Sequence, residues 1–392
     1  MNRSHMRVYF DYNATTPLAP QVVEVVARTS QDLFGNASSV HYFGQQAKAA
    51  VDEARSAVAA LIHGDSSEVV LTSGGTESDN FAIRGAAEAA EVTGRRHLVA
   101  SAIEHEAVLN TVRALARRGW RTTLVPVDQS GIVSPDRVRD ALADDTAIVS
   151  VMHANNEIGT IQPIAELSAI AHQRGALMHT DAVQSVGKIP VDVGELGVDL
   201  LSLSAHKFNG PKGTGALWIK RGTRLLPILT GGKHERNRRA GTENVPAIVG
   251  MGIAARLAIG KMSAEATRVG ALRDRLEDGI LREVPGTAVN GARTARVPNT
   301  TNISFDRVEA ESLLIALDLE GIAVSTGSAC SSGTLEPSHV LRAMGLPAHR
   351  TQNSLRFSLG MFSTQEEVDR VVEALPRLVE KLRGLTRRTA TA

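Results

Sequence analysis

The chain has 392 residues, of which 43% are hydrophobic and 22% are charged, which is typical of a globular protein with about two domains. Lys and Arg (43) nearly balance Asp and Glu (42), and 3% of residues are aromatic, so the composition does not favour a nucleic-acid-binding protein. The chain's one cysteine, Cys330, excludes a disulfide framework and a multi-thiolate metal site within one chain.

The N-terminal residues 1–5 (MNRSH) precede Met6 and are expected to be a cloning scar. They do not resemble a signal peptide, and we find no apolar run of the ~18 residues that a membrane span needs, so we expect no membrane association. We expect a reducing, cytoplasmic location because one cysteine cannot form an internal disulfide.

Helix-like and strand-like segments alternate from residue 45 onward. Apolar residues recur at helical spacing between Ala47 and Leu61, and short apolar runs then alternate with helical stretches. We expect strands at Glu68–Thr72, His97–Ala102, Thr122–Val127, Ala147–Met152, Ala176–Asp181, Val198–Leu203 and Gly215–Lys220. The helices expected between them are Asn80–Ala90, Glu106–Arg118 and Ile164–Arg174. Because several strands are almost wholly apolar, the sequence predicts an α/β fold with a mostly parallel sheet covered on both faces.

The pattern changes after about residue 250, where long helical stretches lead into a shorter α+β region. We expect helices at Val245–Met262, Ala264–Val284 and Gln365–Leu382, and strands at Asn302–Phe305 and Ser354–Leu359. The expected division is a large α/β domain over residues 20–260 and a smaller α+β domain formed by residues 6–19 and 261–392.

Ligands of parallel α/β sheets bind beyond the carboxyl ends of the strands, and three sequence features lie there. Lys207 follows one expected strand and Asp181 ends another. A lysine in such a place can form a Schiff base with pyridoxal phosphate (PLP), whose ring nitrogen a carboxylate keeps protonated. The glycine-rich turn Ser73–Thr76 suits the phosphate, with Ser204 and His206 as further donors. Taken alone, Lys207 fits a surface loop better than a functional site.

Ten motifs in order cover about residues 7–380. They are DYNATTP (Asp11–Pro17), GNASSVH (Gly35–His41), TSGGTESDN (Thr72–Asn80), EHEAV (Glu104–Val108), HANNEIG (His153–Gly159), HTDAVQ (His179–Gln184), SAHKFNGPKG (Ser204–Gly213), RAGTEN (Arg239–Asn244), STGSACSSG (Ser325–Gly333) and LRFSLG (Leu355–Gly360). With them the sequence resembles the cysteine desulfurases of the NifS/IscS type, in the class V aminotransferase family of fold-type I PLP enzymes.

The resemblance implies a set of functional residues. Those expected to bind PLP are Gly75, Thr76, His105, Asn156, Asp181, Gln184, Ser204, His206, Lys207 and Thr242. Those expected to bind the substrate are Asn13, Asn156 and Arg356, and the catalytic residues are His105, Lys207 and Cys330.

Five of these residues have a specific implied role. Lys207 would form the Schiff base, Asp181 would face the ring nitrogen and Gln184 the phenolic oxygen. His105 would stack on the ring and assist proton transfer, although a buried structural histidine is the alternative. Thr242 would reach the phosphate in the neighbouring subunit, which implies a homodimer.

Arg356 would bind the substrate carboxylate, for which the guanidinium fork is suited. Its alternative is a solvated charge on an edge strand. Lys233 and the pair Asn237-Arg238 depart from the family pattern and add positive charge near the expected pocket mouth.

Cys330 lies in a run of small residues from Ser325 to Gly333, which indicates an exposed loop and not a buried, inert thiol. The resemblance implies that L-cysteine is converted to L-alanine while Cys330 receives the sulfur as a persulfide. The expected acceptors are an iron–sulfur scaffold protein or a tRNA-thiolation enzyme. A selenocysteine lyase, a plain aminotransferase and an inactive PLP-fold binding subunit are the alternatives.

Overall fold

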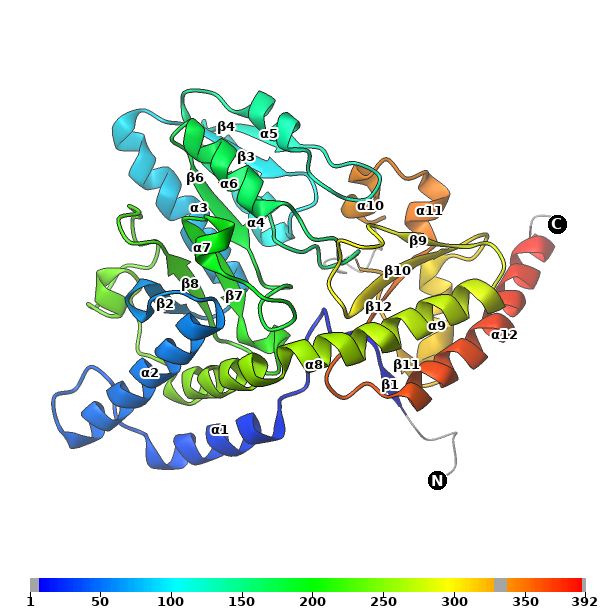
Figure 1. Cartoon of the computed structure of the whole chain (residues 1–392), viewed down its shortest axis with the longest axis horizontal. Helices are drawn as coiled ribbons and strands as arrows, with labels where there is room; N and C mark the ends of the chain where they lie inside the picture. Colours follow the sequence, from blue (N-terminus) through cyan, green and yellow to red (C-terminus); the bar gives the residue numbers. More distant parts are fainter. Residues whose placement is uncertain (1–6, 328–336, 390–392) are drawn as a thin grey trace.

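The computed structural model describes residues 7–327 and 337–389 (Figure 1). Within these residues the largest sheet has seven strands in the order β2-β8-β7-β6-β5-β3-β4. They are β2 Val69–Thr72, β3 His97–Ser101, β4 Arg121–Val125, β5 Thr146–Ser150, β6 Leu177–Asp181, β7 Leu200–Ser204 and β8 Gly215–Ile219. Strands β4, β3, β5, β6 and β7 are parallel neighbours, whereas β8 is antiparallel to β2 and β7. The expected mostly parallel sheet is confirmed.

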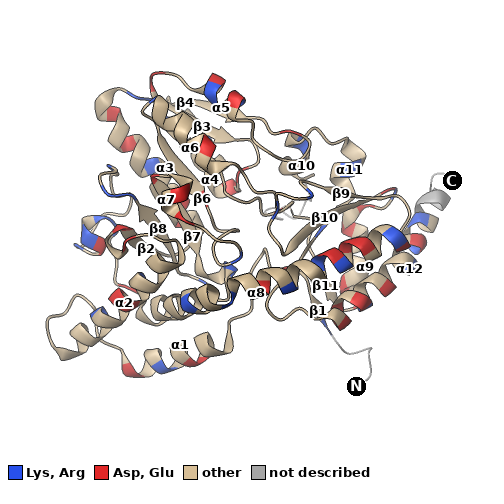
Figure 2. Cartoon of the chain, viewed as in Figure 1, with Lys and Arg blue, Asp and Glu red and all other residues tan. Residues whose placement is uncertain are grey.

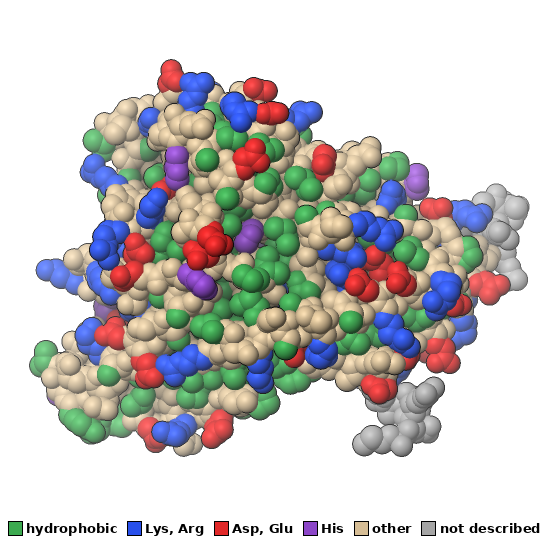
Figure 3. Space-filling view, viewed as in Figure 1, with side chains coloured by type: hydrophobic (Ala, Val, Ile, Leu, Met, Phe, Trp, Pro, Cys, Tyr) green, Lys and Arg blue, Asp and Glu red, His purple; other side chains and the backbone are tan. Residues whose placement is uncertain are grey.

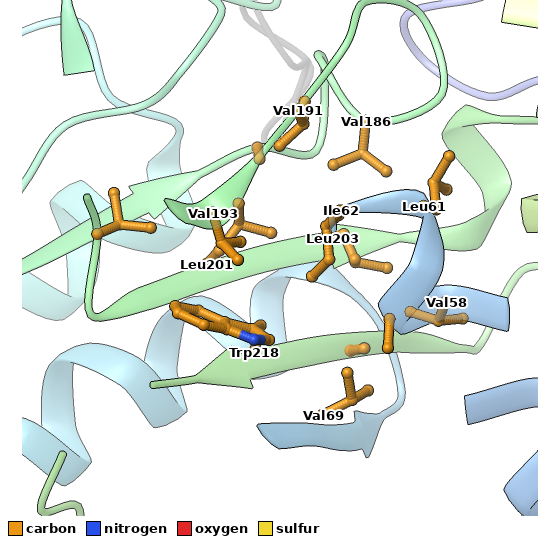
Figure 4. Close-up of a cluster of buried hydrophobic side chains, with 14 of the residues drawn as sticks. Val58, Leu61, Ile62, Val69, Val186, Val191, Val193, Leu201, Leu203 and Trp218 are labelled. Carbon is orange, nitrogen blue, oxygen red and sulfur yellow. The ribbon is translucent and has the colours of Figure 1, made fainter. Parts of the chain in front are cut away.

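Helices cover both faces of this sheet, and alternate strand residues point to opposite layers. In β2, Val69 and Leu71 belong to one core and Val70 to the other. The helices on the Val70 face are α3 Gly75–Ala90 and α4 Glu106–Arg117. Those on the opposite face are α1 Pro20–Asp32, α2 Tyr42–Leu61, α5 Pro135–Ala141, α6 Ile164–Gln173, α7 Val193–Leu196 and part of α8 Val245–Glu283. Figure 4 shows this second core, in which Leu201 and Trp218 come from paired strands.

A smaller α+β unit lies beside the large one and has its own core (Figure 1). Its described strands form an antiparallel sheet in the order β12-β10-β9 and a short parallel pair, β1 with β11. The strands are β1 Val8–Tyr9, β9 Thr287–Asn290, β10 Thr300–Phe305, β11 Ile322–Ala323 and β12 Ser354–Ser358. The helices are α9 Ala310–Leu319, α10 His339–Ala343, α11 Ala348–Gln352 and α12 Gln365–Thr389. Single 3-10 turns are η2 Ser66–Glu68, η3 Glu91–Thr93, η4 Ala205–Lys207 and η5 Glu235–Asn237.

Helix α12 has the amphipathic pattern that the sequence predicts. Val368, Val371 and Leu375 are fully buried in the core of the small unit. Its charged residues lie along the outer surface (Figure 2). Most charged residues of α8 do so too, but Arg273 and Glu277 are buried. On the molecular face shown in Figure 3, side chains of both charge signs are interspersed.

The two helices expected at Val245–Met262 and Ala264–Val284 are one continuous helix, α8, so the predicted break near Ser263 is wrong. Neither proline nor glycine stands at that point, and serine is tolerated inside a helix. The first half of α8 packs in the core of the large unit, and the second half packs in the core of the small unit through Leu276. By length and composition alone α8 is apolar enough to cross a membrane, but a core helix passes the same test.

The contact between α2 and α8 depends on a glycine. A Cβ at Gly252 would lie 2.7 Å from Ala54 Cα and 2.8 Å from Ala54 Cβ. We expect Gly252→Ala to lower the free energy of unfolding by about 1–3 kcal/mol, because the two helices must move apart.

The matched control lies two turns further along α8. A Cβ at Gly260 would meet no atom of the described chain within 4 Å, so Gly260→Ala is expected to raise the free energy of unfolding by about 0.5–1 kcal/mol. Urea unfolding followed by far-UV circular dichroism compares the two variants. Equal effects of the two substitutions would contradict the close packing of α8 on α2.

Candidate active site

Two strand ends bring Lys207 and Asp181 to one edge of the large sheet. Asp181 is the last residue of β6, and Lys207 ends the 3-10 turn η4 directly after β7. Because β6 and β7 are parallel neighbours, both side chains start from the same edge. The carboxylate of Asp181 is buried, accepts a hydrogen bond from the Val183 N–H (2.9 Å), and attracts the Lys207 ammonium.

The amine of Lys207 is held by main-chain oxygens. Its Nζ donates to the carbonyl oxygens of Asn13 (2.5 Å) and Ala14 (2.9 Å). Burial and, next, the positive charge of Arg356 lower the pKa of Lys207 to about 8, against the attraction of Asp181 and other carboxylates. Lys207 therefore loses its proton much more readily than an exposed lysine does.

The start of α3 lies near this lysine and has the features of an anion-binding site. No described side chain caps the first turn, which begins at Gly75, so its backbone N–H groups point outward with the positive end of the helix dipole. Gly74 has φ +148°, and a Cβ there would lie 3.6 Å from Ser204 Oγ. Thr76 in the same turn is exposed. The hydroxyl of Ser204 thus lies close to the uncapped turn.

His206 lies next to Lys207 in η4. Its Nδ1 lies 3.1 Å from Thr15 Oγ1. Burial and then the charge of Lys207 lower the pKa of His206 to about 4, which keeps the imidazole neutral at neutral pH. A neutral ring with one nitrogen bound to a hydroxyl can still hydrogen-bond to an anion through the other nitrogen.

His105 is exposed at the start of α4, so the alternative of a buried structural histidine is wrong. It is the N-cap of the helix, and its Nδ1 accepts a hydrogen bond from Ala107 N–H (3.1 Å). With Nδ1 accepting, the neutral ring carries its proton on Nε2. His105 and Thr76 line the same pocket, and His105 acts electrostatically on Asp181.

Arg356 of β12 is buried, with 4% of its surface exposed, which rules out a solvated edge charge. Its Nη2 pairs with Asp11 Oδ1 (2.6 Å), and its Nη1 donates to the Asn156 carbonyl oxygen (3.0 Å). The Nε atom has no hydrogen-bond partner among the described residues. Sequence reasoning did not single out Asp11, although it begins one of the motifs.

Asn13 is enclosed by protein partners. Its Nδ2 donates to the Asn156 carbonyl oxygen (3.1 Å) and to Thr300 Oγ1 (2.8 Å), and its Oδ1 accepts from Asn299 Nδ2 (2.9 Å) and Lys188 Nζ (3.1 Å). Since both ends of the carboxamide are engaged, its direct contact with substrate stays a prediction.

Gln184 follows β6 and is buried with its carboxamide between two partners. Its Nε2 donates to the Asn13 carbonyl oxygen (3.0 Å), and its Oε1 accepts from Lys188 Nζ (2.6 Å). Sequence reasoning missed Lys188, because an isolated lysine after a strand carries no signal that it points inward.

Cys330 lies outside the described residues, but the chain on either side of it is anchored beside the site. Ser325 pairs with Arg356 through two backbone hydrogen bonds, and Ser338 Oγ donates to the buried Glu157 (2.5 Å).

Thr242 is exposed and follows η5.

The depressed pKa of Lys207 can be measured in cofactor-free protein. We expect acylation of Lys207, followed by peptide mass analysis, to show a pH midpoint near 8 instead of the usual 10.5. Arg356→Met should raise this midpoint because it removes a neighbouring positive charge. Arg275→Met, on the exposed side of α8, is the control and should leave it unchanged. A midpoint near 10.5 in unmodified protein would contradict the burial of this amine.

Known proteins with similar sequences and structures are members of one enzyme family. The aminotransferase class-V family profile matches residues 8–371. The cysteine desulfurase IscS of Dictyoglomus turgidum is 50% identical over 379 residues, which cover 97% of this chain and 96% of that protein. A solved structure described as a NifS-like protein superposes with a TM-score of 0.89 at 37% identity, covering 96% of this chain and 99% of the other. One titled "SspA in complex with cysteine" has a TM-score of 0.80 at 33% identity, covering 92% of this chain and all of the other. The chain belongs to the aminotransferase class-V family.

Proposed function

We propose that the chain is a cysteine desulfurase that uses PLP, converts L-cysteine to L-alanine and passes the sulfur to an acceptor. The observation that carries the proposal is the buried Lys207 amine, poised beside Asp181 at the sheet edge. A relative of 50% identity bears the name cysteine desulfurase, and a structural neighbour binds cysteine by its title. The acceptor class, an iron–sulfur scaffold or a tRNA-thiolation enzyme, and a cytoplasmic location belong to the same proposal.

The residues at this edge fit PLP. The uncapped start of α3, with Gly74, Gly75 and Thr76, suits the phosphate, since a side chain at residue 74 would point toward Ser204. Asp181 supplies a buried carboxylate for the ring nitrogen, and Lys207 supplies the amine. PLP, when bound, withdraws electrons from the substrate amino acid so that its Cα proton becomes acidic.

The chain's own side chains supply binding and proton transfer. Arg356, oriented by Asp11, supplies the guanidinium charge for a substrate carboxylate, and its Nη1 donates to the Asn156 carbonyl oxygen. Lys207, with its pKa near 8, takes up and returns a proton at the substrate Cα. His105, whose Nδ1 accepts a hydrogen bond from Ala107 N–H, can supply a proton from Nε2.

Sulfur transfer falls to Cys330. Its thiolate forms a bond to the sulfur of L-cysteine while the bond between that sulfur and Cβ breaks. The electron pair of the broken bond stays on Cβ, which gains a proton and becomes the methyl group of alanine. Cys330 is left as a persulfide, so the reaction needs no external oxidant or reductant until sulfur is released.

The test of the function is incubation of the PLP-loaded protein with L-cysteine and no reductant. We expect the amount of alanine, measured by amino-acid analysis, to equal the amount of protein that has gained one sulfur atom, measured by intact mass. Cys330→Ser should retain the visible absorption of bound PLP and form no persulfide. Alanine and sulfide production by Cys330→Ser at the normal rate would contradict the role of Cys330. A rate with selenocysteine that far exceeds the rate with cysteine would favour a selenocysteine lyase.

The functional unit in this proposal is a homodimer in which Thr242 reaches the neighbouring phosphate. An exposed aromatic cluster supports it: Phe34 and Tyr42 each have about 70% of their surface exposed and lie 5.1 Å and 5.5 Å from the ring of Phe43. Clustered exposed aromatic rings are typical of protein–protein interfaces.

Charge placed in this cluster should weaken the dimer. We expect the double variant Phe34→Asp, Phe43→Asp to sediment as a monomer and to lose bound PLP, because Thr242 of a partner would no longer reach the phosphate. Val92→Asp is the control, since Val92 is equally exposed (73%) but belongs to η3. Unchanged sedimentation of the double variant would rule out this surface as the interface.

A further inference from the structure

Lys188 is a second lysine beside the site, and the proposed mechanism does not use it. It follows β6 by seven residues, in a turn where its backbone N–H donates to the Ser185 carbonyl oxygen (3.0 Å). Its Nζ donates to Gln184 Oε1 (2.6 Å) and Asn13 Oδ1 (3.1 Å). Both acceptors belong to motifs of the candidate site, so the lysine is tied to that site and not to solvent.

These contacts determine which way the Gln184 carboxamide faces. Lys188 Nζ donates to the oxygen end of the amide, and an ammonium can hold only that end. The Asn13 carbonyl oxygen is an acceptor, so it can hold only the nitrogen end, which lies 3.0 Å away. With one partner of each kind, the amide has one satisfied orientation, and a flipped amide would put oxygen against oxygen.

The nitrogen end of the Gln184 carboxamide lies on the side of the Lys207 amine. Gln184 Nε2 and Lys207 Nζ both donate to the same Asn13 carbonyl oxygen. Because a carboxamide nitrogen carries two N–H groups, Gln184 keeps one for a further acceptor beside Lys207.

We propose that Lys188 is a positioning residue, which locks the Gln184 carboxamide with its N–H side toward Lys207 so that it donates to the phenolic oxygen of bound PLP. The inference rests on the proposed function. Burial and then the charges of Lys207 and Arg356 lower the pKa of Lys188 well below its usual value. The positioning does not depend on its charge, because a neutral amine still has two N–H groups for its two acceptors.

The lock has a spectroscopic consequence. An N–H donor to the phenolic oxygen draws negative charge away from the neighbouring Lys207 nitrogen, which then holds its proton less tightly. Without Lys188 the amide oxygen loses its donor, and only the Asn13 carbonyl oxygen then opposes a turn of that oxygen inward, so the Lys207 proton is held more tightly. Arg356, Asp181 and Asp11 act on Lys207 and are unchanged by a substitution at residue 188. The charge of Lys188 also interacts with Lys207, and the Gln184→Leu background separates this direct effect from the effect through the amide.

The experiment is a pH titration of the visible absorption of the PLP-loaded protein. We expect Lys188→Met to raise the pH midpoint of the colour change by roughly one unit, the size of a single strong neighbouring interaction. Gln184→Leu should raise it in the same direction. In the Gln184→Leu background, Lys188→Met should add no further shift, because its effect passes through the amide.

The matched control is Lys220→Met, which removes an exposed lysine at the end of β8 and should leave the midpoint unchanged. If Lys188→Met does not yield folded protein, Lys188→Gln is the second variant: its shorter chain withdraws the donor from Gln184, so the same upward shift is expected. Thermal unfolding of each variant separates this shift from a loss of stability, which alone would not move the midpoint.

Two outcomes would overturn the inference: an unshifted midpoint in the single variant, or a shift that persists in full in the Gln184→Leu background. The second would show that the charge of Lys188 acts directly. Failure of the unmodified protein to bind PLP would instead overturn the proposed function, so the two failures are distinguishable.

Discussion

The candidate active site depends on residues 11–16, which cross the edge of the large sheet. The carbonyl oxygen of Asn13 accepts hydrogen bonds from Lys207 and Gln184, while its side chain bonds to Thr300 of the small unit. Thr16 adds two bonds to the η4 turn, since its N–H and hydroxyl both donate to the His206 carbonyl oxygen. A main-chain segment therefore positions the reactive amine, and it joins the two units at the same point.

Electrostatic interactions explain why the Lys207 amine at the sheet edge loses its proton readily. Lys188, Lys207 and Arg356 lie close together, and burial and the neighbouring positive charges lower the pKa of both lysines. A guanidinium stays charged in proteins, so the pKa values of the two lysine amines fall instead. Asp11 pairs with Arg356 and thereby holds the remaining charge in a fixed direction. The cluster produces a reactive amine without any special property of the lysine itself.

The positions of the strands along the chain and their ends were predictable because apolar runs and glycine turns are local signals. The placement of Asp181 and Lys207 at one sheet edge follows from that topology alone. The inward direction of Lys188 and the pairing of Asp11 with Arg356 were not predictable, since both depend on contacts between segments far apart in sequence. The continuity of α8 was missed because a helix that changes its buried face between two cores shows no single periodic stripe.

That helix also governs how the molecule can deform. Among the described residues the chain passes between the two units along α8 and through the short stretch before α1. An unbroken hydrogen-bonded helix bends gradually and does not pivot at one residue. A relative motion of the two units would then be distributed as bending over several turns of α8. The pocket beside Lys207, which residues of both units line, would then open only by small angles.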